Sequence, residues 1–173
     1  MQVLLNGRVG RTSVPVGPGV VGGLIGGIAM AMIMMVVTAT KGMGFFKPLY
    51  LIAATFHQSW AMQSGFALGP VLVGAMLHMM LSIMFGLVFV VALPMVARSG
   101  TGASIWIIAG MVWGVIVLAV NQYIVLPIVN PAMATATGMS DMIFWWVVAH
   151  LMFGLVLGAI AAKSVTADRP VTI

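Results

Sequence analysis

Residues 74–86, GAMLHMMLSIMFG, lie in the middle of a long apolar run that has no charged side chain. Within this stretch Gly74, His78, Ser82 and Gly86 recur every four residues. On an α-helix such spacing gathers small and polar side chains on one narrow stripe, with larger apolar side chains around it. The stretch therefore predicts a helix that is apolar on most of its circumference and packs closely along one face.

The composition of the whole chain indicates a membrane protein. Of 173 residues 62% are hydrophobic and 5% are charged, and the mean hydropathy is +1.21. Ordinary globular domains have about 25% charged residues, so seven Lys and Arg with two Asp and Glu cannot cover a water-exposed surface. The basic residues are scattered between apolar runs, so the net charge of +5 indicates lipid-headgroup contacts, not nucleic-acid binding. The chain has no cysteine, which excludes disulfides and thiolate metal ligands.

Four apolar runs, uncharged except for Asp141 at the start of the last, are long enough to cross the hydrocarbon core, which takes roughly 20 helical residues. We expect transmembrane helices at about residues 20–40, 70–97, 103–126 and 141–162. Residues 48–65 become polar in their second half and are short for a span, so they predict an interfacial or re-entrant helix. The predicted fold class is an all-α integral membrane protein with a bundle of four transmembrane helices. Its domains are a flexible basic tail (1–19), one transmembrane domain (20–163) and a polar tail (164–173).

The distribution of Lys and Arg predicts the orientation of the chain. With four spans, five of the seven basic residues share one side, and the positive-inside rule then places both termini in the cytoplasm. If residues 48–65 also spanned, the ratio would again be five to two with the N-terminus outside, but the length and polarity of this segment favour four spans. We expect a bacterial or archaeal plasma membrane.

Small residues recur at steps of four in every predicted helix, and residues 150–162 repeat the pattern of a histidine followed by small residues. Membrane helices associate where small side chains let their backbones approach closely. Such faces therefore predict tight packing within the bundle and a face left over for a partner. The residues assigned to helix packing are Gly23, Gly27, Gly74, Ser82, Gly86, Gly110, Gly114, Gly154 and Gly158.

Polar residues gather in the outer half of the predicted bundle. At about 1.5 Å per residue, His78 lies about 12 Å into its helix from the external side, and His150 lies at a similar depth. Asn121 lies near the external end of the third helix, and His57 belongs to the segment on the same side. These four residues are the candidate cofactor-binding residues of a single outward-facing site.

The two intramembrane histidines have three interpretations. In the first, they serve packing only, by hydrogen bonding to polar or backbone groups and holding helices together. Neutral imidazoles from two helices can also coordinate haem iron, copper or zinc, which makes His78 and His150 candidate metal ligands, with haem or copper as the cofactor. Contact with a quinone or another small substrate is the third interpretation.

The 17 methionines raise the alternative of copper binding, since a thioether is a soft ligand for Cu(I). Met76, Met80 and Met84 form a stripe, but at helical spacing they point away from His78. We therefore interpret these methionines as packing or lipid-facing side chains.

The sequence has no Gly-rich phosphate loop, no HExxH, no nucleophile elbow and no paired carboxylates, so it predicts no enzymatic activity. The favoured function is a non-enzymatic accessory or self-associating subunit, whose partners would be the lipid bilayer and other membrane subunits or further copies. The alternative is a haem-, metal- or quinone-binding membrane protein with its site at His78 and His150. A second alternative is a small-solute permease, although few polar groups line the inner half.

Overall fold

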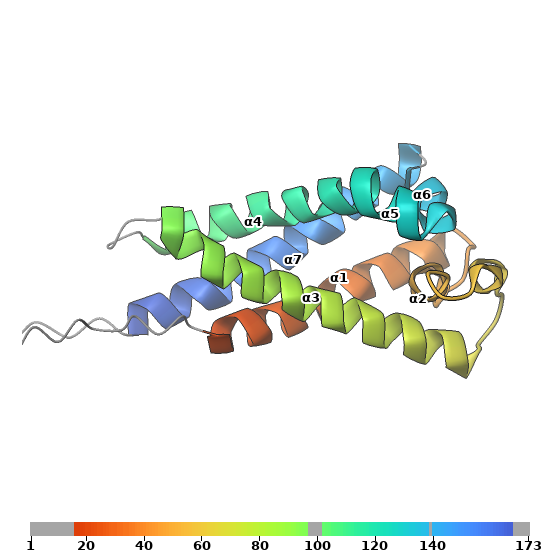
Figure 1. The fold of residues 1–173 in the computed structure, drawn as a ribbon, viewed down its shortest axis with the longest axis horizontal. Helices are drawn as coiled ribbons and strands as arrows, with labels where there is room; N and C mark the ends of the chain where they lie inside the picture. Colours follow the sequence, from red (N-terminus) through yellow and green to blue (C-terminus); the bar gives the residue numbers. More distant parts are fainter. Residues whose placement is uncertain (1–15, 97–101, 139, 168–173) are drawn as a thin grey trace, which may run out of the picture.

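The computed structural model describes residues 16–96, 102–138 and 140–167, and every regular element in them is helical (Figure 1). The long helices are α1 (Val16–Thr40), α3 (Leu68–Val96), α4 (Ala103–Val120) and α7 (Ser140–Ala167). Shorter elements lie between them: α2 (Lys47–Ala53), the 3₁₀ helix η1 (Gln58–Met62), the π-helix η2 (Asn121–Val125), α5 (Leu126–Val129) and α6 (Pro131–Gly138).

Four segments are long and apolar enough to cross a membrane, namely residues 16–40, 68–92, 103–129 and 141–164. The predicted fold class, with a short helix between the first and second spans, is therefore confirmed. Helix α1 begins at Val16, before the predicted residue 20, because Pro18 lies in the first turn, where proline is tolerated. The third span extends past residue 126, through η2 and α5. Most of both predicted tails lies outside the described residues.

The long helices form an incomplete ring. Helix α1 packs against α3 and α7, and α7 packs against α4, whereas α3 and α4 make few contacts with each other. The order around the bundle is therefore α3, α1, α7, α4, with a gap between the last and the first. The start of α1 and the end of α7 lie at the same end of the bundle (Figure 1), which we call the terminal end.

Glycines occupy the places where helix backbones meet. A Cβ added at Gly23 of α1 would lie 2.5 Å from the carbonyl oxygen of Ser82 on α3. Gly110 of α4 and Gly154 of α7 face each other so closely that a Cβ on either would overlap the other's carbonyl oxygen. A Cβ at Gly158 would lie 2.5 Å from the carbonyl oxygen of Trp106.

The remaining predicted packing residues also meet helices of the same chain. Gly27 lies against the Ser82 side chain, and Gly86 lies against Gly19 of α1. Gly74 touches the backbone of α2, and Gly114 touches the carbonyl of His150. The small-residue stripe of α3 therefore faces α1 and α2, and the stripe of α7 faces α4.

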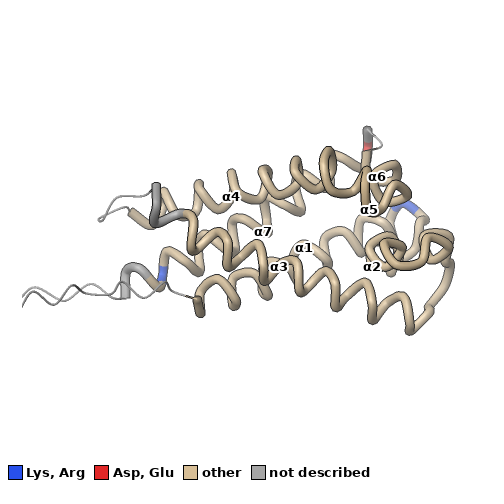
Figure 2. Tube along the Cα trace, viewed as in Figure 1, with Lys and Arg blue, Asp and Glu red and all other residues tan. Residues whose placement is uncertain are grey.

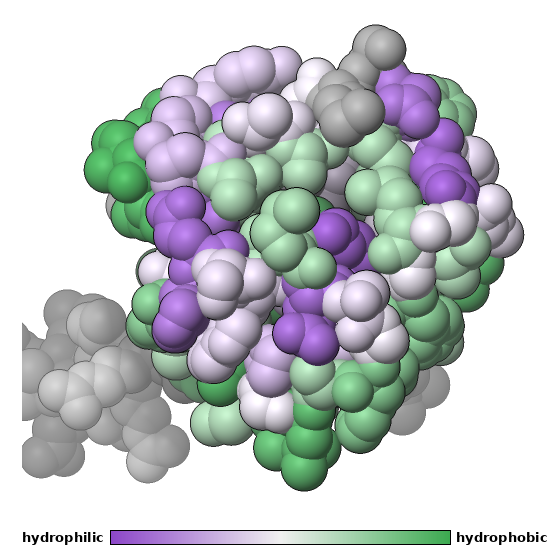
Figure 3. All heavy atoms as spheres, turned by 90° about the vertical axis from the view of Figure 1, so that its right-hand side faces the viewer, coloured by the Kyte–Doolittle hydropathy of each residue, from purple (hydrophilic) through white to green (hydrophobic). Residues whose placement is uncertain are grey.

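The opposite end of the bundle is closed by the short elements α2, η1, α5 and α6, which we call the cap. Figure 2 shows charged residues only towards the two ends of the described bundle. At the cap end the Lys41 ammonium donates to the Asp141 carboxylate over 2.8 Å and joins α1 to α7. Figure 3 looks onto the cap, where hydrophilic residues gather, while hydrophobic residues surround them.

Two buried side chains, Asn130 between α5 and α6 and Tyr50 of α2, hold the cap together. The Asn130 amide nitrogen donates to the Leu51 carbonyl (2.7 Å) and to the Thr55 hydroxyl (2.9 Å), and its oxygen accepts from the Met133 backbone N–H (3.0 Å). Asn130 thus caps the N-terminus of α6 and ties it to α2. The Tyr50 hydroxyl donates to the Gly65 carbonyl over 2.6 Å, which fixes the loop after η1 on α2.

Candidate functional site

A cavity of about 290 Å³ lies between α3 and α4 at the cap end, where these two helices fail to pack. Side chains from α1 and α7 form its floor, and α2, η2, α5 and α6 complete its walls. Its lining is mostly apolar, with a few polar groups. Its volume is close to the lower limit of small-molecule sites, which occupy roughly 300–1,000 Å³. This cavity is therefore large enough for a single small organic ring.

The cavity belongs to a longer groove between α3 and α4. The Trp113 indole of α4 donates to the Phe85 carbonyl of α3 over 3.2 Å and crosses this groove. On the terminal-end side of that hydrogen bond lies a second, apolar depression of about 390 Å³, with Ile105 and Ile108 among its lining residues. Because large apolar side chains border the groove and are exposed, its open side faces lipid in a bilayer.

His78 enters the cavity from α3, and only 6% of its surface is exposed. Its Nε2 lies 2.9 Å from the Gly27 carbonyl oxygen on α1. A carbonyl only accepts hydrogen bonds, so Nε2 carries the hydrogen. In the neutral ring Nδ1 is then an acceptor.

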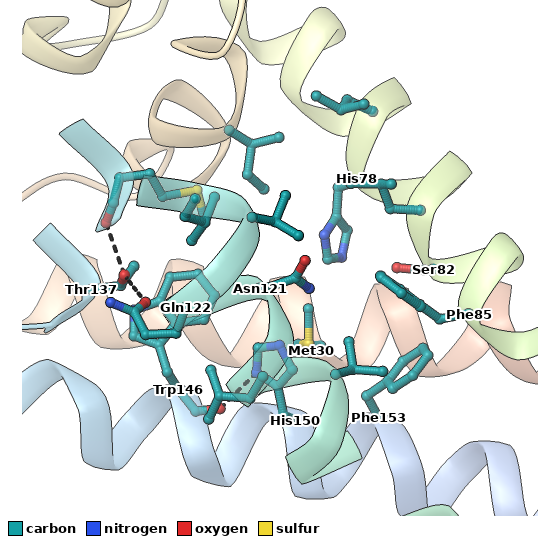
Figure 4. Close-up of a pocket in the computed structure, with 18 of the residues that line it drawn as sticks. Met30, His78, Ser82, Phe85, Asn121, Gln122, Thr137, Trp146, His150 and Phe153 are labelled. Carbon is teal, nitrogen blue, oxygen red and sulfur yellow. Dashed lines mark hydrogen bonds between the residues drawn. The ribbon is translucent and has the colours of Figure 1, made fainter. Parts of the chain in front are cut away.

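His150 enters the cavity from α7 and is equally buried. Its Nδ1 lies 2.8 Å from the Trp146 carbonyl oxygen, one turn earlier, so Nδ1 is the donor and Nε2 is the acceptor. Figure 4 shows the rings of His78 and His150 projecting towards the same space, with Asn121 between them in this view. The only acidic residue in the described part of the chain is Asp141, which pairs with Lys41 at the end of the bundle. Since an unpaired charge within the membrane is costly, both rings are neutral.

Helix α4 widens into the π-helix η2 where it borders the cavity. The Leu126 N–H bonds to the Asn121 carbonyl, five residues earlier. Pro127 has no N–H to donate and its ring crowds the preceding turn, which favours such a wider turn. The π-helix brings the consecutive residues Asn121 and Gln122 to the cavity wall.

Asn121 and Gln122 differ in the hydrogen bonds that they make. The Gln122 amide donates to the Ala134 carbonyl over 2.9 Å and accepts from the Thr137 hydroxyl, so it joins η2 to α6. The Asn121 side chain makes no hydrogen bond with any other described residue and lines the cavity. The Asn121 amide is therefore available to a ligand.

The structure brings three of the four predicted cofactor-binding residues, His78, His150 and Asn121, to one cavity. His57 does not line it. The His57 ring is exposed, shares a hydrogen bond of 2.9 Å with the Ser59 hydroxyl and stacks on Trp60. The sequence places His57 at the correct end of the bundle but does not reveal that the turn before η1 faces outwards.

Sequence reasoning did not select the apolar side chains of the site. Met30, Phe85 and Phe153 line the cavity, but their residue types are common in every helix of this chain. The methionine stripe does not line the cavity and is exposed: Met76 is 71% exposed, Met80 61% and Met84 44%.

The residues present give a metal ion few ligands. No group of three or more His, Cys, Asp or Glu side chains that could hold a metal occurs among the described residues. The two histidines do have the hydrogen-bonding pattern of metal ligands, which usually donate their second N–H to a carbonyl or carboxylate. The Met30 side chain lines the same cavity. His78 and His150 therefore remain metal-ligand candidates, in a cavity that is otherwise suited to an organic molecule.

Comparison with protein-family models, with curated proteins and with solved structures found no match to this chain. The function is therefore inferred from the geometry of the cavity.

Opposite tautomers are expected for the two cavity histidines. NMR of isotope-labelled histidine ring nitrogens at neutral pH should show hydrogen on Nε2 of His78 and on Nδ1 of His150, because each faces a backbone carbonyl. The exposed His57 provides the comparison signal. A ring of His78 or His150 with both nitrogens protonated would show that this ring has no lone pair with which to accept a hydrogen bond from a ligand.

Proposed function

We propose that this chain is a small membrane protein that binds a lipid-soluble organic molecule in the cavity between α3 and α4. The gap between these helices supports the proposal, since it opens towards lipid over apolar walls. The available groups of His78, His150 and Asn121 converge within it. Apolar walls with a few convergent polar groups are typical of small-molecule sites. On the predicted topology this site lies in the outer half of the membrane.

The alternatives have less support. A volume of about 290 Å³ is small for haem, and a metal ion alone would leave most of the cavity unfilled. The hypothesis of an accessory or self-associating subunit depended on glycine faces free for partners, but these faces contact helices of the same chain. A permease needs a polar path, whereas the depression on the terminal-end side of Trp113 has an apolar lining.

Toluene provides a test, because apolar cavities of this size class bind small apolar rings. In solubilised protein, toluene should saturably shift the indole N–H resonance of Trp146, which lines the cavity, and spare that of Trp106, which does not. Both indole nitrogens are buried and have no hydrogen-bond partner in the described part of the chain, so each is a sensitive reporter.

Two neighbouring substitutions on α3 make the toluene test specific. Leu77→Trp fills the cavity, because Leu77 lines it, and should abolish the Trp146 shift. Met76→Trp adds the same indole on the lipid-facing side and should leave the shift unchanged. Equal shifts of Trp146 and Trp106 in the wild type, or no Trp146 shift, would contradict the proposed function.

A further inference from the structure

In each cavity histidine, one ring nitrogen is a hydrogen-bond donor and the other is an acceptor. His78 donates from Nε2 to the Gly27 carbonyl, and His150 donates from Nδ1 to the Trp146 carbonyl. Each neutral ring therefore offers one lone pair and no further N–H. Asn121 adds an amide that can donate or accept and has no partner among the described residues.

A ligand that meets both histidines must donate hydrogen bonds. Quinones, ketones and ethers carry only acceptors, so their oxygens would face the lone pairs of His78 and His150. A buried acceptor that loses water without gaining a donor is costly. Hydroxyl groups supply the missing hydrogens and satisfy both rings without moving them.

The apolar walls indicate an aromatic ring on that hydroxyl. Phe85 and Phe153 lie on the terminal-end side of the two histidines, and Trp146 lies on the cap side, all lining the same cavity (Figure 4). Aromatic side chains favour stacked or edge-to-face contacts with another ring. A volume of about 290 Å³ suits one ring, and a hydrocarbon substituent could leave through the gap between α3 and α4.

We propose, resting on the function proposed above, that the ligand is a phenolic ring whose hydroxyl donates to Nδ1 of His78 or Nε2 of His150; the single hydroxyl of a phenol meets one of these acceptors, and the two hydroxyls of a hydroquinone can meet both. The site then selects the reduced, hydroxylated form of such a ring over its quinone or ether, because only the hydroxyl brings a donor. A free phenol and a membrane-borne hydroquinone with a hydrocarbon chain both carry such a donating ring hydroxyl.

Phenol, anisole and toluene test this donor preference, since they share a ring and differ in the donor. Binding is followed by the Trp146 indole resonance, with Trp106 as internal control, and by the histidine ring-nitrogen resonances. Phenol should bind roughly tenfold more tightly than anisole and toluene, in line with the net contribution of the one hydrogen bond that its hydroxyl donates. It should also shift Nδ1 of His78 or Nε2 of His150, whichever accepts that hydrogen bond.

The outcomes separate this inference from the proposed function. If toluene, anisole and phenol bind equally well and Leu77→Trp blocks all three, the cavity site stands and the donor preference is wrong. If none of the three binds, the inference and the proposed function both fall. If zinc or copper in stoichiometric amount shifts Nδ1 of His78 and Nε2 of His150 while phenol shifts neither nitrogen, the histidines are metal ligands and the inference is wrong.

His150→Phe removes one of the two acceptors and keeps an aromatic ring of similar shape. It should still bind toluene, which shows that the fold is intact, its preference for phenol over anisole should be smaller, and bound phenol should then shift Nδ1 of His78. His57→Phe is the matched control, because His57 lies outside the cavity, and it should keep the full preference. If His150→Phe does not fold, the three-probe comparison in the wild type decides the question alone.

A long-chain alkylphenol distinguishes the two sources of this chemistry. If it displaces phenol from the Trp146 site in reconstituted vesicles, the hydrocarbon chain fits the α3–α4 gap and a membrane-borne ring is supported. If it does not displace phenol, the ligand class is restricted to free phenols and the membrane-borne form is excluded.

Discussion

Replacing Gly154 by alanine is expected to destabilise the bundle by about 2 kcal/mol, within the range of roughly 1–3 kcal/mol for overpacking a well-packed interior. The added Cβ would overlap the Gly110 carbonyl oxygen and lie 2.6 Å from its carbonyl carbon. These are backbone atoms, so no side-chain rotation relieves the contact, and α4 and α7 must move apart. Thermal unfolding in detergent, followed by circular dichroism, should show a transition lower by several degrees.

Gly17→Ala is the matched control for that substitution. Gly17 lies in the first turn of α1, and a Cβ there would meet nothing within 4 Å. The same methyl group should therefore change stability by no more than about 0.5 kcal/mol. If Gly154→Ala and Gly17→Ala unfold at the same temperature, the close approach of α4 and α7 is not present in the protein.

Replacing Asn130 by alanine is expected to cost about 3 kcal/mol, because it leaves buried backbone groups without partners. Asn130 is fully buried, and its amide joins the Leu51 carbonyl of α2 to the Met133 N–H of α6. The cap should loosen while the long helices remain. Chemical unfolding and hydrogen exchange of the α2 amides measure the two effects separately.

Asn130→Asp separates the two roles of Asn130. Asp and Asn are equally good N-caps, so a residue that only capped α6 would tolerate this change. Aspartate cannot donate to the Leu51 carbonyl, and we therefore expect Asn130→Asp to be destabilising as well. Thr135→Ala is the control, since the exposed Thr135 hydroxyl bonds only to the Pro131 carbonyl of its own helix. Full stability of Asn130→Asp would show that the link between α2 and α6 is unimportant.

The four spans could be predicted because lipid imposes a simple requirement on sequence. A run of about 20 apolar residues must satisfy its backbone groups internally, and in hydrocarbon only a helix does so within one segment. The ends were less well predicted. Pro18 and Pro127 look like helix boundaries, yet one lies in the first turn of α1 and the other follows a π-helix inside the third span.

The partners of each helix face could not be predicted from the sequence. A stripe such as Gly154 and Gly158 shows that some backbone comes close, but the same pattern serves a helix of this chain or of another protein. The missing contact between α3 and α4, which creates the cavity, has no local signal, because it depends on how α1 and α7 hold the other helices.

The candidate site was predicted in part. His78, His150 and Asn121 stand out because strong polar groups are rare in apolar helices, and the predicted topology places the two histidines at one depth and all three residues on the external side. The role of Asn130 has no signal in the sequence, because its partners on α2 lie far away along the chain. Which ring nitrogen of each histidine donates depends on the position of a backbone carbonyl, and no sequence pattern gives that position.

Photolabelling in vesicles tests the ligand site most directly. A phenol that carries a diazirine group is added to reconstituted protein, activated by light, and its attachment sites are read by mass spectrometry. We predict label on α3 around His78 and on α7 around His150, which excess phenol suppresses. Label confined to lipid-facing side chains such as Met76 and Ile108, and unchanged by excess phenol, would contradict a ligand site between α3 and α4.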